Sequence, residues 1–234
     1  MSAVLSVEAI HTFIGQFHIL QDVTVEVPPN SITALLGRNG AGKTTTLRSI
    51  MGLNPPTRGA IQFHGQAIHG RKPYTIAQQG IGYVPDYRAI FKQLTIEENL
   101  KVAERKKGDL AGKRDFIFEV FPDLQRLYHW PGGQLSGGQQ QMLAIARALV
   151  PDNTLLLIDE PSEGLAPVIV EQMMAAIRKL SDQNAVLLVE QNFIVASRLA
   201  DRYVIIEDGR SVHAGLMKDL LNDKALITKY LGAA

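Results

Sequence analysis

The chain has 234 residues, of which 46% are hydrophobic, a formal net charge of +1 and no cysteine. This length is sufficient for one domain with a buried core, whereas the near-neutral charge argues against a nucleic-acid partner, which would require a concentrated basic surface. The lack of cysteine excludes disulfide bridges, thiolate metal sites and cysteine nucleophiles.

Apolar residues alternate with polar ones in two segments near the start of the chain, which predicts two antiparallel strands. The apolar positions of these segments are Leu5, Val7, Ala9, Val23, Val25 and Val27. A continuous apolar run over residues 31–36 predicts a buried strand, and Asn30 before it marks a tight turn, because Asn tolerates a left-handed backbone. A helix is expected over residues 43–51, ending at Gly52.

Three helical patterns follow, over residues 95–107, 115–121 and 137–149. Strands and helices then alternate: a strand over 155–158, a helix over 167–180, a strand over 186–190 and a helix over 193–200. Two further strands, over residues 203–206 and 211–214, flank a turn typical of a hairpin. This order predicts an α/β fold whose mostly parallel sheet is extended by the antiparallel N-terminal strands.

The grouping of the three helical patterns predicts a helical subdomain inserted into the α/β core. We expect a single domain over residues 1–234, with the core formed by about residues 1–86 and 151–234. The inserted subdomain covers about residues 87–150.

The eight residues that directly follow the strand at 31–36 match the phosphate-loop pattern GxxxxGK followed by Ser or Thr. They are Gly37, Arg38, Asn39, Gly40, Ala41, Gly42, Lys43 and Thr44. Glycines in such a turn allow successive N–H groups to point at phosphate oxygens, and the start of a helix favours an anion. We expect Lys43 to reach the β- and γ-phosphates, Thr44 to bind Mg²⁺, and Thr45 to complete the nucleotide site. The alternative is a glycine-rich turn without a ligand.

Two acids, Asp159 and Glu160, end the apolar strand at residues 155–158. A buried parallel strand brings such residues to the carboxyl edge of the sheet, beside a phosphate loop. Asp159 is expected to hold Mg²⁺ through water, and Glu160 to act as the general base for the attacking water. The alternative is a pair of acids that face solvent at the end of a strand.

A third motif, Leu-Ser-Gly-Gly-Gln, begins the helix at 137–149. Ser136 can cap this helix, and Gly137 and Gly138 expose N–H groups at its positive end, so the motif forms a second candidate anion site. A capped helix after a glycine-rich linker explains the same residues without any ligand.

These three motifs, in this order over nearly the whole chain, resemble the ATP-binding cassette (ABC) ATPases. The resemblance implies ATP and Mg²⁺ as ligands and a head-to-tail dimer that encloses two ATP molecules. Ser136, Gly137 and Gly138 would then contact the γ-phosphate bound to the partner's loop.

Four positions depart from the pattern of this family. Gln191 stands in place of the switch histidine, and Asp86 in place of the glutamine that joins the core to the helices. Asp86 still offers oxygen to Mg²⁺. Ala166 replaces an aspartate after the acid pair. Ile14 replaces the aromatic residue that stacks on adenine, which leaves Phe13 as the candidate base contact, with a buried core role as its alternative.

The departures resemble one subgroup, the smaller ATPase subunits of branched-chain amino acid importers and their urea and amide relatives. That resemblance implies that the chain pairs with a second ATPase subunit, or with itself, beneath membrane permeases. The region around Phe91, Leu94 and Leu127 would face a permease. A periplasmic or extracellular solute-binding protein would be an indirect partner, and the location would be the cytoplasmic face of the inner membrane.

The substitution at Gln191 suggests a difference in rate between sites. Glutamine can donate and accept a hydrogen bond at the γ-phosphate or the lytic water, but it cannot carry the charge of a proton as imidazolium does. We therefore hypothesise that catalysis by Glu160 with Gln191 is slower than at a partner site that contains His.

Neither a signal peptide nor a membrane span is expected, because the first 13 residues lack a basic stretch followed by a long apolar run and the longest apolar runs have the length of strands. Two other functions remain open: a soluble ABC ATPase that acts outside transport, and a regulatory nucleotide-binding module without turnover. The intact Glu160 argues against the second.

Overall fold

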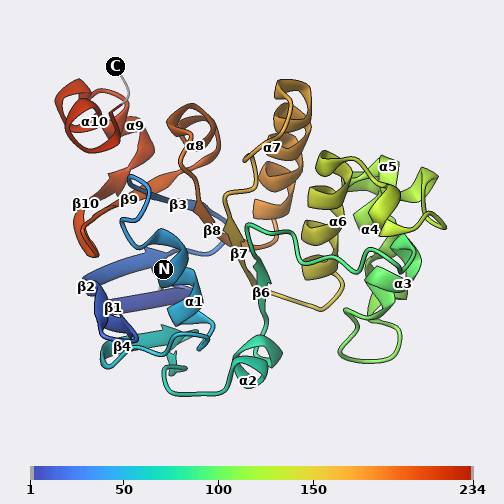
Figure 1. Ribbon diagram of the computed structural model, residues 1–234, viewed down its shortest axis with the longest axis horizontal. Coiled ribbons are helices and arrows are strands. Elements are labelled where there is room, and N and C mark those ends of the chain that lie inside the picture. The colour runs from blue at the N-terminus through green and yellow to red at the C-terminus, as the bar shows by residue number, and fades with distance from the viewer. Residues whose placement is uncertain (1–2, 233–234) are drawn as a thin grey trace.

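The computed structural model describes residues 3–232, and the strands within this range form one ten-stranded sheet (Figure 1). An antiparallel arm contains β1 (Leu5–Ile14), β2 (Phe17–Val27), β4 (Arg58–Phe63) and β5 (Gln66–Ala67). The remaining strands are β3 (Ile32–Leu36), β6 (Ile81–Val84), β7 (Leu155–Asp159), β8 (Ala185–Val189), β9 (Arg202–Glu207) and β10 (Arg210–Leu216). Their order across the sheet is β5-β4-β1-β2-β10-β9-β3-β8-β7-β6.

The antiparallel arm confirms the two strands predicted near the start of the chain, with one error at Ala9. In β2 the predicted alternation of buried and exposed residues is present. In β1, Ala9 is exposed with a φ of 45°, and it lies at a register shift between Val7 and Ile10. This β-bulge inserts an extra residue, so the buried face continues at Ile10 and Thr12 instead of at Ala9.

The parallel part of the sheet is buried on both faces. β3 pairs in parallel with β8 and β9, and β7 pairs in parallel with β6 and β8. Every residue of β3, β7 and β8 is buried, which explains why these strands are continuous apolar runs. The predicted hairpin is also present: β9 and β10 are joined through Asp208 and Gly209, both with positive φ, as a two-residue type I′ turn requires.

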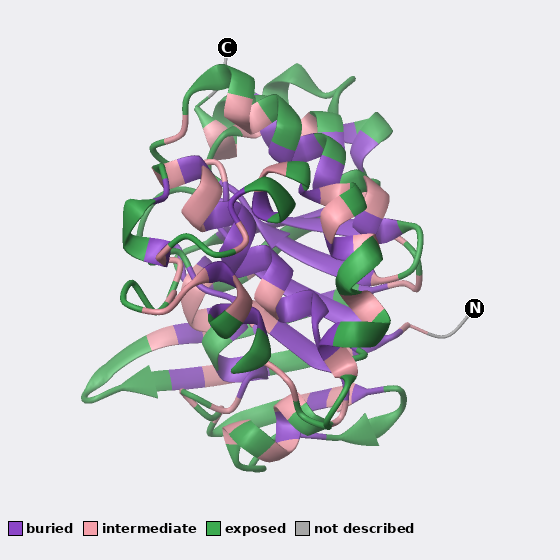
Figure 2. Ribbon diagram, turned by 90° about the vertical axis from the view of Figure 1, so that its right-hand side faces the viewer, coloured by how far each residue is buried: buried purple, intermediate pink, exposed green. Residues whose placement is uncertain are grey.

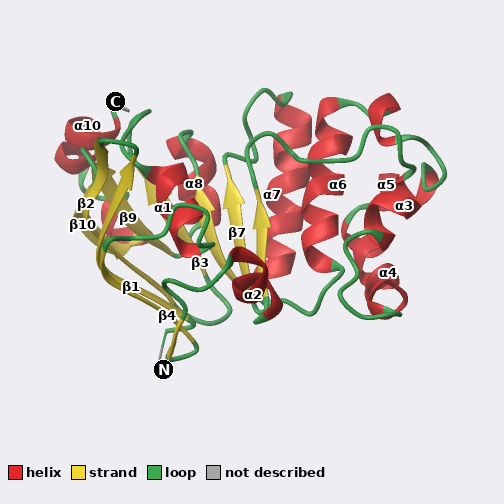
Figure 3. Cartoon of the chain, turned by 60° about the horizontal axis from the view of Figure 1, so that its bottom comes forward, coloured by secondary structure: helices red, strands yellow, loops and turns green. Residues whose placement is uncertain are grey.

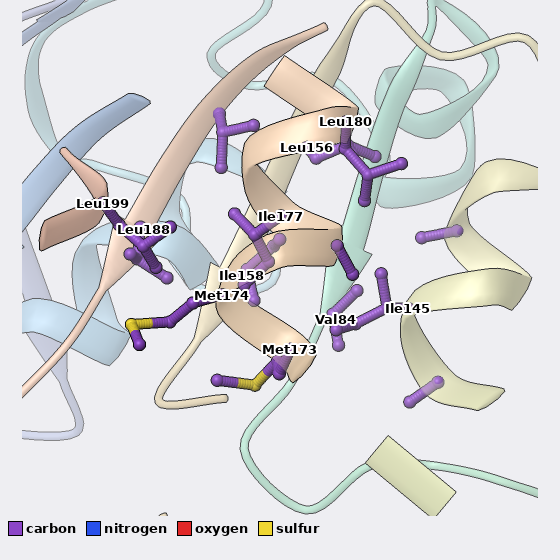
Figure 4. Close-up of a cluster of buried hydrophobic side chains, with 14 of the residues drawn as sticks. Val84, Ile145, Leu156, Ile158, Met173, Met174, Ile177, Leu180, Leu188 and Leu199 are labelled. Atoms are coloured by element: carbon purple, nitrogen blue, oxygen red, sulfur yellow. The ribbon is translucent and has the colours of Figure 1, made fainter. Parts of the chain in front are cut away.

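Helices cover the two faces of the sheet with separate hydrophobic clusters. On one face α1 (Lys43–Ile50) packs with the arm. On the other face lie α6 (Gly137–Leu149), α7 (Pro167–Ser181) and α8 (Phe193–Leu199). Figure 4 shows Met173 and Met174 of α7 among aliphatic side chains of the strands, and Figure 2 shows the sheet buried between these layers.

Six further α-helices complete the fold within residues 3–232, and several of them were not predicted. They are α2 (Pro73–Gln78), α3 (Ile96–Lys101), α4 (Asp109–Val120), α5 (Pro122–Arg126), α9 (Met217–Leu220) and α10 (Lys224–Leu231). Helices α3 to α6 lie together beyond the edge strand β6 (Figures 1 and 3). The division of the chain at about residues 87 and 150 stays a prediction.

The helix predicted over residues 95–107 is wrong at its end, because α3 ends at Lys101. The carboxylate of Glu104 accepts hydrogen bonds from the N–H groups of Gly108 and Leu110, and that of Asp109 accepts from Arg105 and Lys106. These bonds stabilise a turn that competes with continued helix. The next helix, predicted from residue 115, accordingly begins at Asp109.

Candidate functional site

The phosphate loop lies where the sequence predicted, between the end of β3 and the start of α1. Two of its glycines are required by close approach. A Cβ added at Gly37 would lie 2.3 Å from the carbonyl oxygen of Ile206, and one added at Gly42 would lie 2.7 Å from the Leu20 side chain. Both have positive φ values, 149° and 111°, so a larger residue would also strain the backbone.

Lys43, the first residue of α1, is almost completely buried at 4% exposure. Its ammonium donates hydrogen bonds to the carbonyl oxygens of Gly37 at 2.9 Å and Arg38 at 3.2 Å. It also lies 3.6 Å from Oε1 of Glu160, which follows β7. The side chain is therefore folded into its own loop, where its charge faces both the loop and the acid pair.

Asp159 at the end of β7 is fully buried, and its two carboxylate oxygens differ in their surroundings. Oδ1 accepts a hydrogen bond of 3.2 Å from the Thr44 hydroxyl, whereas Oδ2 has no hydrogen-bond partner among residues 3–232. Burial, together with the negative charges of Asp86 and Glu160, raises the pKa of Asp159 to about 7, although the Thr44 hydrogen bond and the charge of Lys43 act in the opposite direction. The two carboxylate oxygens of Asp159, of which Oδ2 is unpartnered among residues 3–232, can act as ligands and fit a hard divalent cation.

Asp86 follows β6 and is exposed, and its Oδ1 accepts a hydrogen bond from the N–H of Tyr87 at 2.9 Å. β6 and β7 are parallel neighbours with Val84 opposite Ile158, so Asp86 and Asp159 both follow at the same edge of the sheet. The structure thus brings Thr44, Asp159 and Asp86 to one region, as their assignment as metal ligands requires.

Glu160 has a left-handed backbone, with a φ of 43°, and its N–H donates to the carbonyl oxygen of Val189 at 2.9 Å. This conformation is uncommon for a residue with a Cβ and turns the chain sharply out of the sheet. Glu160 and Gln191 both line a pocket of about 420 Å³. The two residues predicted to be catalytic are therefore adjacent to the same cavity.

A third residue of this pocket, Glu190, was missed by sequence reasoning. It is 2% exposed, and its carboxylate accepts hydrogen bonds from the N–H of Ser162 at 3.1 Å and of Asn192 at 3.3 Å. Burial raises its pKa. The sequence contained a signal for an acid at this position, since Glu190 directly follows an apolar run, as Asp159 does.

The Leu-Ser-Gly-Gly-Gln motif at residues 135–139, called the signature motif below, begins α6 with a capping box. The N–H of Gln139 donates to Oγ of Ser136 at 3.3 Å, and the N–H of Ser136 donates to Oε1 of Gln139 at 3.0 Å. A Cβ added at Gly138 would lie 2.4 Å from the side chain of Ile169 on α7, and one added at Gly137 would lie 3.3 Å from the guanidinium of Arg88. Close packing thus requires a glycine at 138.

The two candidate anion sites, the phosphate loop and the signature motif, are separated in space. In Figures 1 and 3, α1 with its phosphate loop lies on one side of β7 and β6, and α6 with the signature motif lies on the other. One chain therefore does not bring Ser136, Gly137 and Gly138 to the phosphate loop.

Phe13 near the tip of the β1–β2 hairpin is 43% exposed, so its alternative role as a buried core residue is wrong. Its ring stacks on that of His18, with centroids 4.1 Å apart and an interplanar angle of 6°. His18 covers one face of the ring, and the exposed part of Phe13 is the candidate surface for a base. Sequence reasoning missed another aromatic near the phosphate loop: Tyr230 of α10 lines a pocket of about 300 Å³ together with Arg38 and Asn39.

Comparison with known proteins identifies the family. Residues 20–163, which include the phosphate loop, the signature motif and both acids, match the family described as ABC transporter. The chain belongs to the ABC transporter family. Its predicted fold, a mostly parallel core with an antiparallel N-terminal arm and a helical region, is the fold of the ABC ATPases.

Two relatives in this family carry names that indicate a transport system. The high-affinity branched-chain amino acid transport ATP-binding protein BraG of Pseudomonas aeruginosa is 41% identical, over 97% of this chain and 99% of its own length. The probable branched-chain amino acid transport ATP-binding protein LivF of Archaeoglobus fulgidus is 39% identical, over 88% of this chain and 89% of its own.

Solved structures agree with the fold. An ABC transporter ATP-binding cassette in its ADP conformation superposes with a TM-score of 0.86 at 24% identity, covering 100% of both chains. The ATP-binding subunit of another ABC transporter superposes with a TM-score of 0.82 at 28% identity, covering 95% of this chain and 94% of that one.

Proposed function

We propose that this ABC ATPase powers an importer of branched-chain or related amino acids. The observation that carries the proposal is the linkage of the phosphate loop to the acid pair, through Lys43 with Glu160 and through Thr44 with Asp159. The similarity to BraG and LivF supports the class of solute. Relatives that import urea or amides are the alternative within the same subgroup.

In the proposed site, the N–H groups from Gly37 to Thr45 bind the phosphates of ATP at the start of α1. Lys43 exchanges its hydrogen bonds to the loop carbonyls for the β- and γ-phosphate oxygens. Thr44, Asp159 and Asp86 would hold Mg²⁺, which when bound would offset the negative charge of the phosphates. Glu160 accepts the proton of the attacking water, and Gln191 orients that water or the γ-phosphate.

The signature motif is proposed to act on a partner subunit, either a second ATPase or another copy of this chain. Ser136, Gly137 and Gly138 lie away from the phosphate loop of their own chain, which supports a head-to-tail dimer in which they contact the partner's γ-phosphate. Phe13 is the proposed base contact.

The surface that meets the permease is proposed to include a pocket of about 290 Å³ between β6, α2 and α6. Arg88, Arg105 and Arg147 line it, and none of the described residues around it is acidic. Arg147 also lies over the ring of Phe91, which we predicted to be near a permease, whereas Leu127 is buried. Because three arginines and no carboxylate within residues 3–232 line the pocket, we expect it to bind a permease segment that carries acidic residues.

The membrane location follows from such a partner. No helix within residues 3–232 combines the length and the apolar character needed to cross a bilayer. We propose that permease subunits hold the chain at the cytoplasmic face of the inner membrane, and that a periplasmic or extracellular solute-binding protein delivers the solute on the other side.

The proposal is tested by purifying tagged Glu160→Gln protein from detergent-solubilised native membranes in the presence of ATP, followed by mass spectrometry. The variant should bind ATP without hydrolysing it, so the closed dimer should persist with two permeases and a second ATPase or a second copy. The co-purifying binding protein would indicate the solute. Recovery with soluble partners alone would instead support an ABC ATPase that acts outside transport, and hydrolysis at the parental rate would remove Glu160 as the base.

The effect of Gln191 is tested in the same complex. Replacing Gln191 with His restores a group that can carry a proton's charge, and we expect the ATPase rate to rise. An unchanged rate would contradict the hypothesis that this substitution makes the site slower.

A further inference from the structure

Glu190 is a buried acid that has no part in the proposed chemistry. It follows β8 at 2% exposure, between the buried Val189 and the exposed Gln191. No Lys or Arg within residues 3–232 forms an ion pair with it. An unpaired carboxylate in such a position is costly unless other donors compensate its charge.

Two backbone donors compensate it, and they come from different segments. The N–H of Ser162 belongs to the segment after β7 that begins with Glu160, and the N–H of Asn192 belongs to the segment after β8 that contains Gln191. Each of the two carboxylate oxygens accepts one of these hydrogen bonds. Glu190 itself belongs to the second segment, so its bond from Ser162 ties that segment to the first, and its bond from Asn192 fixes the turn of the second segment beside the pocket.

The two segments differ in their local structure. The first contains left-handed backbone at Glu160 and at Gly164, with φ values of 43° and 68°. The second continues into α8, where the side chain of Asn192 accepts hydrogen bonds from the N–H groups of Ile194 and Val195. The other direct link at this point is the bond from Glu160 N–H to the carbonyl of Val189, the last residue of β8.

We propose that Glu190 is a positioning residue, whose carboxylate holds the segments of Glu160 and Gln191 in fixed relation across their shared pocket. The inference rests on the proposed role of Glu160 as general base. The geometry requires an acceptor at both oxygens, because each faces an N–H group. Glutamine has nearly the same shape but presents an NH₂ group to one of these donors, so it can accept from Ser162 or from Asn192 but not from both.

The test compares Glu190→Gln with the parental protein in the assembled complex. We expect kcat for ATP hydrolysis to fall about tenfold or more, because one charge-assisted bond is lost and a donor faces a donor. KM for ATP should stay within about twofold, because the phosphate loop is not altered. Glu190→Asp keeps both acceptors on a shorter side chain and should give an intermediate kcat, and it serves as the second variant if the Gln protein does not accumulate.

A matched control removes a carboxylate charge elsewhere. Glu171 on α7 pairs with Arg198 on the surface, and Glu171→Gln should leave kcat unchanged. Hydrogen exchange on the full-length chain provides a direct readout of the two bonds, since the amides of Ser162 and Asn192 should exchange faster in Glu190→Gln and should be unaffected in Glu171→Gln.

The outcomes separate this inference from the proposed function. If the parental complex hydrolyses ATP in a Glu160-dependent way and Glu190→Gln has the same kcat, the positioning role is wrong and the function stands. If kcat falls together with a large rise in KM, Glu190 affects nucleotide binding and the positioning role is again wrong. If the complex has no Glu160-dependent hydrolysis, the proposed function fails. Unchanged hydrogen exchange at the amides of Ser162 and Asn192 in Glu190→Gln would separately refute the restraint of the two segments.

Discussion

The phosphate loop and the signature motif are both glycine-rich turns that open a helix, yet their internal contacts differ. In the phosphate loop the cation Lys43 is bound by carbonyl oxygens of its own loop and lies beside Glu160. In the signature motif Ser136 is bound by Gln139 of its own helix, and Gly138 packs on Ile169. The first site contains the cation and the acids needed for a nucleotide, whereas the residues of the second carry no charge of their own and lie beside the guanidinium of Arg88.

The difference indicates how the work is divided between the two motifs. A nucleotide can bind to one chain through the phosphate loop, because the cation and the acids are supplied by the same sheet edge. The signature motif offers N–H groups and a hydroxyl, but the phosphate loop of its own chain lies on the other side of β6 and β7 (Figures 1 and 3). Changes in the phosphate loop should therefore affect nucleotide binding by the single chain, and changes in the signature motif should affect association.

The largest effect is expected from Lys43→Ala. Removing the only ammonium inside the loop should lower ATP hydrolysis by about 100-fold or more, because the γ-phosphate charge is no longer offset. Calorimetric titration of the single chain with ATP should show weakened binding. Arg48→Ala removes a cation from the last turn of the same helix and is the control for a general effect of charge. Equal ATP affinity in Lys43→Ala and the parental protein would contradict the role of Lys43.

The next effect is a pH-dependent gain in stability from Asp159→Asn in the protein without nucleotide or metal. The pKa of Asp159 rises from 3.8 to about 7 in the folded state, chiefly through burial, so the folded chain holds a proton that the unfolded chain releases between these values. Stability should therefore fall as the pH rises from about 4 to 7, by up to about 4 kcal/mol at about 1.4 kcal/mol per pH unit.

Chemical denaturation at pH 4 and pH 8 measures this effect. Asp159→Asn should be more stable than the parental protein at pH 8, and the advantage should shrink toward pH 4, where Asp159 is protonated in the folded state. Asp152→Asn removes an acid that is paired with Lys113 on the surface, and should give no comparable gain at pH 8. A constant difference at the two pH values would show that Asp159 does not titrate as stated.

The sequence predicted well those features that depend on residues close together in the chain. The phosphate loop, the capped start of α6 and the hairpin between β9 and β10 are all defined within a few residues. It failed where a side chain bonds to a distant or competing backbone group. Glu104 ends α3 in this way, and the contact of Glu190 with Ser162 joins residues 28 apart, which no local pattern encodes.

A smaller effect is expected on the free energy of unfolding when the two glycines of the signature motif are replaced, with a different direction at each position. Gly138→Ala places a Cβ 2.4 Å from Ile169, so we expect a loss of about 1–3 kcal/mol in the free energy of unfolding. Gly137→Ala meets only the flexible end of Arg88, and alanine favours the helix, so this variant should be neutral or gain up to about 1 kcal/mol. Ile169→Ala should relieve the cost of Gly138→Ala, and equal stability of the two alanine variants would refute the packing argument.

The smallest effect separates the cap of α6 from its proposed contact with a partner. Ser136 and Thr95 occupy the same position in two capping boxes, at the starts of α6 and α3. Replacing either by Ala should cost about 1 kcal/mol of stability, measured by urea denaturation, because an N–H group at the start of the helix loses its acceptor. In a Glu160→Gln background, however, only Ser136→Ala should also weaken ATP-dependent association, measured by analytical ultracentrifugation. Equal weakening by Thr95→Ala would mean that the cap acts through helix stability alone, and the signature motif would lose its distinction from an ordinary capped helix.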